Sequence, residues 1–197
     1  LDAETSWNVD VGAKTRTERL SATVGVFYNR VEDYIVKEQQ SSGDYQYMNY
    51  ADVSLYGGEA SLQCKLAYGL SAFGSVSCVR AENNDTDQEL PDIPPLKAHY
   101  GLRFEREIAK GRQLWGELAC TTAARQDRPG PNERETAGYT RADIRCGVDI
   151  TENWRLTAVL ENVTDRRYRN HVSTAWQAFG FTDQPGRNGK IMLIARF

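Results

Sequence analysis

The sequence predicts an all-β protein, an antiparallel up-and-down transmembrane β-barrel to which this chain contributes about nine or ten strands. Apolar and polar residues alternate with period two through most of the chain, and helical spacing is hard to find. The alternating segments approach the roughly 9–11 residues that a tilted strand needs to cross a bilayer. Short and long connections also follow one another in turn, as in outer-membrane barrels, where one rim carries tight turns and the other carries long loops.

The first strands are predicted in the N-terminal half of the chain. Leu20 and Val24 share one face of an extended segment, and Thr23 lies on the other face. The same alternation continues on both sides of a tight turn near Gly69. We expect strands at 7–16, 20–31, 45–67 and 70–81, of which the third could be two strands separated near Val53.

The later strands keep the same apolar phase. Leu102 and Arg103 are expected on opposite faces of their strand, and so are Ile144 and Arg145. We expect these strands at 96–106, 112–125, 138–149, 153–163 and 189–197. The long polar connections are expected at 32–44, 82–95, 126–137 and 164–188.

Composition excludes several classes of protein. The chain has 197 residues, of which 40% are hydrophobic and 10% aromatic, so it carries enough apolar material to fold. Lys and Arg number 24 against 27 Asp and Glu, so the sequence predicts no nucleic-acid partner. The longest aliphatic run, Ile191 to Ala195, is too short for a spanning helix, which needs about 20 residues.

The cysteines and histidines do not form a catalytic or metal-binding pattern. No C-x-x-C spacing occurs, and His99 and His171 stand apart from any nucleophile motif, so we predict neither a metal, a cofactor nor an enzymatic activity. All four cysteines fall in the apolar phase, which favours free thiols, and a Cys64–Cys78 bridge is the alternative. These residues are Cys64, Cys78, Cys120 and Cys146.

The polar phase of the strands carries charges of both signs. Such a set suits a wet barrel lumen or a contact with a polar domain inserted into it. The alternative is the solvated face of a soluble β-sandwich, although sandwich strands are usually shorter. The lumen or plug-facing candidates are Glu59, Lys97, Arg103, Glu117, Arg141, Asp143 and Arg145.

Aromatic and basic residues of the long loops are candidates for ligand contact. Aromatic rings stack on ligands and guanidinium groups bind anionic oxygens, but a structural role in the loops is an equal or better explanation. The ligand-binding candidates are Arg125, Arg128, His171, Trp176, Phe179 and Phe181. A further aromatic set lies near strand ends, where it predicts contact with the membrane boundary or, alternatively, core packing. It consists of Trp7, Tyr68, Trp115 and Trp154.

The last third of the chain carries a recognisable order of motifs. Leu160-Glu161-Asn162-Val163-Thr164-Asp165-Arg166-Arg167-Tyr168 is followed by Gly180-Phe181, by Pro185-Gly186-Arg187 and by a final alternating strand that ends in Phe197. This order resembles the C-terminal end of TonB-dependent outer-membrane receptors. Glu4-Thr5 leading into Gly12-Ala13-Lys14 looks like an earlier strand of the same family, with Asp10 where glutamate is usual.

The resemblance implies a barrel of about 22 strands filled by an N-terminal plug. Such receptors import scarce ligands, often iron–siderophore complexes, with energy passed on by TonB. The implied partners are therefore the TonB complex, reached through the plug, a ferric-siderophore ligand and the lipid of a Gram-negative outer membrane. Phe197 resembles the terminal aromatic that the barrel-assembly machinery reads.

From this resemblance we expect residues 1–197 to be the C-terminal part of such a barrel, without the plug, the signal peptide or the earlier strands. The function expected of the complete protein is active import of a scarce ligand. A passive porin-like barrel and a soluble secreted β-sandwich binding module are the two alternatives.

Overall fold

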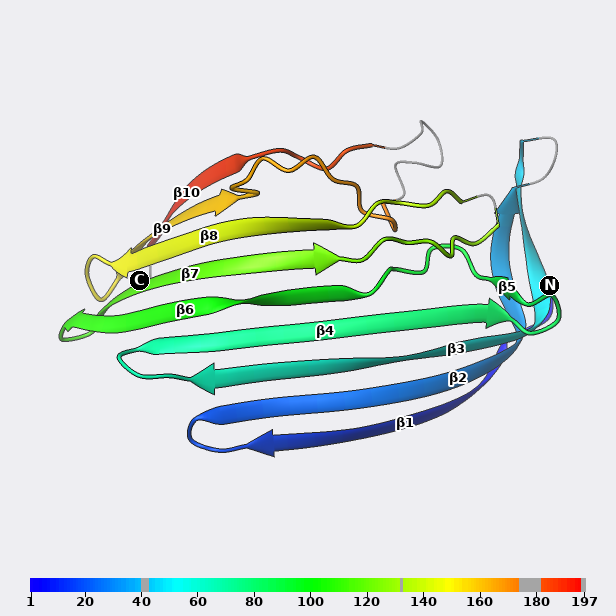
Figure 1. Ribbon diagram of the computed structural model, residues 1–197, viewed down its shortest axis with the longest axis horizontal. Coiled ribbons are helices and arrows are strands. Elements are labelled where there is room, and N and C mark those ends of the chain that lie inside the picture. The colour runs from blue at the N-terminus through cyan, green and yellow to red at the C-terminus, as the bar shows by residue number, and fades with distance from the viewer. Residues whose placement is uncertain (40–42, 132, 174–181, 196–197) are drawn as a thin grey trace.

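The computed structural model describes residues 1–39, 43–131, 133–173 and 182–195. These residues form a single antiparallel sheet of ten strands (Figure 1). The first five are β1 (Thr5–Arg16), β2 (Leu20–Gln39), β3 (Tyr45–Lys65), β4 (Leu70–Asn83) and β5 (Gln88–Glu89). The others are β6 (Lys97–Ala109), β7 (Arg112–Ala123), β8 (Tyr139–Asp149), β9 (Trp154–Glu161) and β10 (Asn188–Ala195). Within the described residues, no helix has the length and hydropathy needed to cross a membrane.

The sheet has an up-and-down topology. Each long strand pairs with the next along the chain, in the order β1-β2-β3-β4-β6-β7-β8-β9-β10, and the short β5 pairs with β4. Short turns gather on the left of Figure 1 and long connections on the right. In the described part of the chain, β1 and β10 are the two edges of the curved sheet.

The expected strands are present, and the structure corrects some of their bounds. The third strand is continuous from Tyr45 to Lys65, so the proposed break near Val53 is wrong. The predicted loop at 32–44 is also wrong over most of its length, because β2 runs to Gln39 and pairs with β3. The cause is local: Asp33 has a φ of +56° and is skipped in the ladder, and the apolar run Tyr34-Ile35-Val36 that follows lacks the alternation used to recognise a strand.

One face of the sheet is apolar and exposed. Cross-strand register aligns Leu102 with Leu118 and then Ile144 on this face, and each of these side chains is more than 40% exposed. The described residues form one sheet, with no second sheet to cover the apolar side chains. A soluble β-sandwich needs that second layer, so this alternative is wrong.

A small hydrophobic core lies at the end of the sheet that carries the long connections. Val53, Ala81 and Leu90 are almost fully buried there, and Tyr34 and Ile93 pack against them. Val53 and Ala81 lie on the face of the sheet that is polar elsewhere. This face becomes apolar where β5 and the segment after it pack onto the sheet. The core therefore anchors the connection between β5 and β6.

Candidate functional site on the polar face of the sheet

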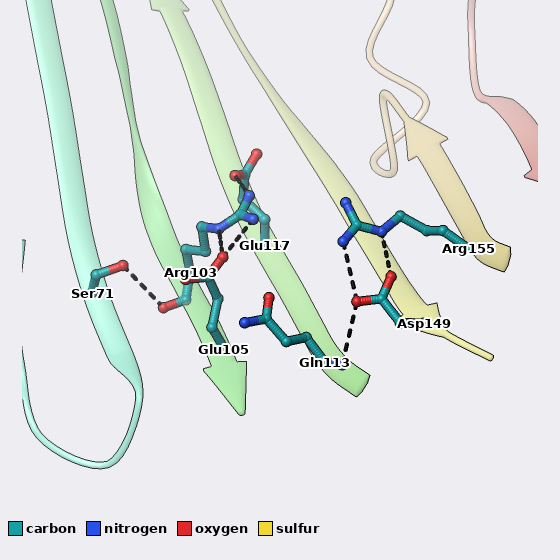
Figure 2. A network of polar contacts seen from close by, with 7 residues as sticks. All are labelled: Ser71, Arg103, Glu105, Gln113, Glu117, Asp149 and Arg155. Atoms are coloured by element: carbon teal, nitrogen blue, oxygen red, sulfur yellow. Dashed lines mark hydrogen bonds and ion pairs between the residues drawn. The ribbon is translucent and has the colours of Figure 1, made fainter. Parts of the chain in front are cut away.

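A row of charges crosses three neighbouring strands on the polar face. Register places Arg103 of β6 opposite Glu117 of β7, and Glu117 opposite Arg145 of β8. The two Glu117 oxygens accept hydrogen bonds from Arg103 at 3.3 Å and from Arg145 at 3.4 Å. Arg103 also donates two hydrogen bonds to Glu105, at 2.9 and 2.7 Å (Figure 2). The half-buried row is thus held in place while part of each guanidinium remains exposed.

Trp115 lies on the same face, two residues from Glu117 along β7 and nearer the short turns. The Arg103 guanidinium carbon sits 4.7 Å from the centre of the indole ring, a cation–π distance. The opposite residue is Gly147, where an added Cβ would lie 2.6 Å from the indole nitrogen. The prediction that Trp115 lies at the membrane boundary is therefore wrong, because its phase puts it on the polar face. The absence of a side chain at Gly147 creates the space that the ring occupies.

A second ion pair lies nearer the short turns. Arg155 of β9 donates to both oxygens of Asp149, at 2.6 and 3.1 Å, and Asp149 also accepts the backbone N–H of Gln113 (Figure 2). This bidentate contact joins β7, β8 and β9. Like the row formed by Arg103, Glu117 and Arg145, this ion pair links neighbouring strands.

The remaining predicted charges of this face lie closer to the long connections. Lys97 is aligned through Ser77 with Glu59, and both are exposed. Asp143 is only 1% exposed, and Arg141 pairs with it at 3.4 Å. The register places every predicted lumen residue on one face, and a role in contacting a plug stays a prediction.

The Asn162 motif forms a buried joint at the end of β9. The Asn162 side chain is 1% exposed: it donates to the carbonyls of Arg166 and Pro185, at 2.9 and 3.3 Å, and accepts the Arg166 N–H at 2.9 Å. The backbone N–H of Asn162 donates to the Asp143 carboxylate at 2.9 Å. Nearby, Asp165 accepts the Arg187 N–H at 2.8 Å. The motif that carried the resemblance thus ties the β9 end to the segment leading into β10.

The long connections are also linked through buried His171. Its ring is 5% exposed, with Nδ1 3.2 Å from the hydroxyl of Thr136 and Nε2 3.4 Å from a carboxylate oxygen of Glu133. Glu133 also accepts the N–H groups of Gly130 and Asp92, at 2.8 Å each. Burial, and then the charge of Glu133, raise the pKa of the Asp92 carboxyl. Three connections therefore meet at Glu133, which the sequence interpretation missed because no spacing marks a contact between such distant loops.

Arg125 and Arg128 lie on the same connection as Glu133 but form ion pairs of their own. Arg125 pairs with Glu135 on the surface, and Arg128 pairs with Glu89 at 3.3 Å. Trp176, Phe179 and Phe181 lie outside the described residues, as does Phe197. Contact of this set with a ligand, and recognition of Phe197 by the assembly machinery, stay predictions.

The cysteines are all free thiols. Cys64 is aligned with Ala72 near one end of the β3–β4 pair, whereas Cys78 is aligned with Gly58 near its middle. Register therefore excludes the Cys64–Cys78 bridge that the spacing left open.

The fold and this face define a class of protein: a β-barrel wall with one apolar face and one charged face. The family model described as "TonB dependent receptor-like, beta-barrel" matches residues 1–163. The chain belongs to this family. Heme/hemopexin utilization protein C of Haemophilus influenzae is 25% identical over 156 residues, which cover 77% of this chain and 20% of that protein.

Solved structures have the same fold. The copper transporter OprC matches 98% of this chain and 31% of its own, with a TM-score of 0.90 and 24% identity. The FrpB iron transporter from Neisseria meningitidis matches all of this chain and 32% of its own, with a TM-score of 0.74 and 17% identity. The ferric yersiniabactin uptake receptor FyuA from Yersinia pestis matches 98% of this chain and 30% of its own, with a TM-score of 0.69 and 20% identity. The chain thus spans between a fifth and a third of the length of these proteins.

Proposed function

We propose that residues 1–197 form the C-terminal part of the barrel of an outer-membrane receptor that actively imports a scarce ligand. The proposed ligand is an iron–siderophore complex and the proposed energy source is TonB. The observation that carries the proposal is that a chain of this family has an exposed apolar face and, on the opposite side of the sheet, a face whose charges form ion pairs between strands. The proposed location is the outer membrane of a Gram-negative bacterium.

The two faces have different proposed partners. The apolar face contacts lipid acyl chains, which accounts for its many exposed large side chains. The polar face contacts a plug: Arg103 and Arg145 are oriented by Glu117, so that their remaining N–H groups can bind plug carboxylates or carbonyls. A row anchored within the wall can release the plug without rearranging, as repeated transport cycles require.

The long connections are the proposed ligand entrance. Arg125 and Arg128 are exposed and basic, and guanidinium groups bind the anionic oxygens of ferric complexes. His171 holds two connections together beneath this surface. Trp176, Phe179 and Phe181 are proposed to stack on the ligand, and Phe197 to be read by the assembly machinery.

Uptake by the receptor that contains this chain tests the proposal. The receptor is expressed in a Gram-negative strain lacking its own iron receptors, with or without TonB, and supplied with radioactive iron as ferric enterobactin. We expect accumulation only in the strain with TonB. Equal accumulation without TonB would support the passive porin-like alternative.

The ligand class is tested in the same strains. Similar proteins are named for haem, copper and ferric yersiniabactin, so haem and Cu²⁺ are supplied in parallel. Uptake of haem or copper without any iron–siderophore complex would retain the active importer and overturn the proposed ligand. Absence of TonB-dependent uptake for every probe would overturn the importer itself.

A further inference from the structure

A hollow of about 520 Å³ lies where β7 and β8 meet the long connections. Its lining residues are Thr122, Ala123, Gly138, Tyr139, Thr140 and Arg166. The Arg166 side chain is exposed, and its guanidinium makes no ion pair with a carboxylate of the described residues. The backbone of Arg166 is fixed on both sides by Asn162, so its position beside the hollow is set by the buried joint. This rim hollow therefore presents a cation whose backbone is fixed and whose guanidinium has no carboxylate partner in the described part of the chain.

Hydroxyl groups extend from the rim hollow across the apolar face. The hydroxyl of Tyr100 lies 3.4 Å from that of Thr122, which lies 3.0 Å from that of Thr140. Register places these residues in the same phase as exposed Leu102 and Leu118. The hydroxyl row is thus a polar strip on an otherwise apolar surface.

The strip leads to a larger hollow of about 620 Å³ on the same face. This apolar hollow is lined by small residues such as Ala22, Ala60 and Gly74, together with Leu62 and Tyr100. Tyr100 thus belongs to both the hollow and the strip. Thr140 is two strands from Tyr100, a separation of about 10 Å at ordinary strand spacing. One amphiphile can therefore place a polar group in the rim hollow and an acyl chain in the apolar hollow.

We propose that the outer face binds a phosphate-bearing lipid of the outer leaflet. Arg166 contacts the phosphate, Thr140 and Thr122 hydrogen-bond the headgroup, and one acyl chain lies in the apolar hollow. The planar guanidinium suits two phosphate oxygens at once, which complements its lack of a partner within the described chain. The apolar hollow on the same face selects a lipid over free phosphate. The inference rests on the membrane location in the proposed function and is independent of the ligand and of TonB.

Lipid binding to the receptor that contains this chain, purified in a neutral phosphate-free detergent, tests the inference. Dioleoyl phosphatidic acid is titrated and bound lipid is counted by native mass spectrometry. We expect Arg166→Gln to weaken binding at least fivefold. Arg167→Gln is the matched control: the Arg167 side chain is 88% exposed and faces Asp183, so binding should be unchanged. Equal binding by the wild type and Arg166→Gln would overturn the inference.

Two further titrations separate the possible sources of the phosphate. Dioleoylglycerol, which has the same chains and no phosphate, should bind much more weakly, and equal binding would overturn the role of Arg166. Inorganic phosphate should not displace the lipid at matched concentration, and full displacement would overturn the commitment to a lipid. Because these assays use purified protein without TonB, their failure leaves the uptake result unaffected.

Discussion

The buried joint at Asn162 makes the sharpest prediction about stability. Asn162→Ala removes three side-chain hydrogen bonds, two to the Arg166 backbone and one to the Pro185 carbonyl. At about 1 kcal/mol for each bond the loss is about 3 kcal/mol. The φ of +51° at this position adds about 1 kcal/mol for alanine, which tolerates the left-handed region less well than asparagine. The hydrogen-bond and backbone contributions together predict a local loss of about 4 kcal/mol.

Hydrogen exchange measures this loss where it occurs. The Arg166 amide is bonded directly to Asn162, so peptides that begin several residues before Arg166 and include it should exchange faster in the variant. A loss of about 4 kcal/mol corresponds to nearly a thousandfold increase in rate, on the order of 10³, when exchange follows local opening. Asn153→Ala in the exposed turn between β8 and β9 is the control, and it should leave these peptides unchanged.

A second variant separates the two contributions. Asn162→Gly also removes the hydrogen bonds but adopts a positive φ freely, so its loss should be about 1 kcal/mol smaller than that of alanine. Unchanged exchange in Asn162→Ala would refute the reasoning that this joint holds the segment. A glycine variant as stable as wild type would show that the hydrogen bonds contribute nothing.

Two other substitutions test individual contacts. Burial and Glu133 raise the pKa of Asp92 above its ordinary value of 3.8, so the folded state holds the proton more tightly than the unfolded state, and stability falls as pH rises through this range. Asp92→Asn should therefore raise the melting temperature at pH 7, with the gain vanishing below about pH 4, where both states are protonated. Gly147→Ala places a Cβ 2.6 Å from the Trp115 indole, so it should cost about 1–3 kcal/mol in denaturant unfolding and shift the tryptophan emission. Gly116→Ala, whose Cβ meets nothing closer than 4.0 Å, is the matched control.

Contrary outcomes are equally specific. A gain from Asp92→Asn that persists at pH 3 would mean that its charge is not the cause. Equal stability of the Gly147 and Gly116 alanine variants would mean that the indole is not confined by its neighbour.

The strand phase was predictable because period two is a local property of the chain. Leu102 and Arg103 face opposite sides in any register, so the two faces of the sheet followed directly from the sequence. The same rule places Trp115 on the polar face, and the boundary interpretation failed because it weighed position along the strand above phase. The alternation failed as a guide at Asp33, where the ladder is interrupted.

The loop contacts were not predictable from local pattern. Glu133, His171 and Asp92 meet through connections far apart in the sequence, and only the folded sheet brings those connections to one end. Asn162 was noticed as part of a motif, but its role as a joint depends on burial and on a positive φ, which composition does not encode.

The central claim is that the two faces of this sheet meet different environments, lipid on one side and the barrel interior on the other. Two single-tryptophan forms of the receptor test it, one keeping Trp115 and one carrying Leu118→Trp with Trp115→Phe. These positions lie on one strand and on opposite faces. In bilayers with brominated acyl chains, we predict strong quenching of the tryptophan at position 118 and little quenching of Trp115. Equal quenching at both positions would contradict the account.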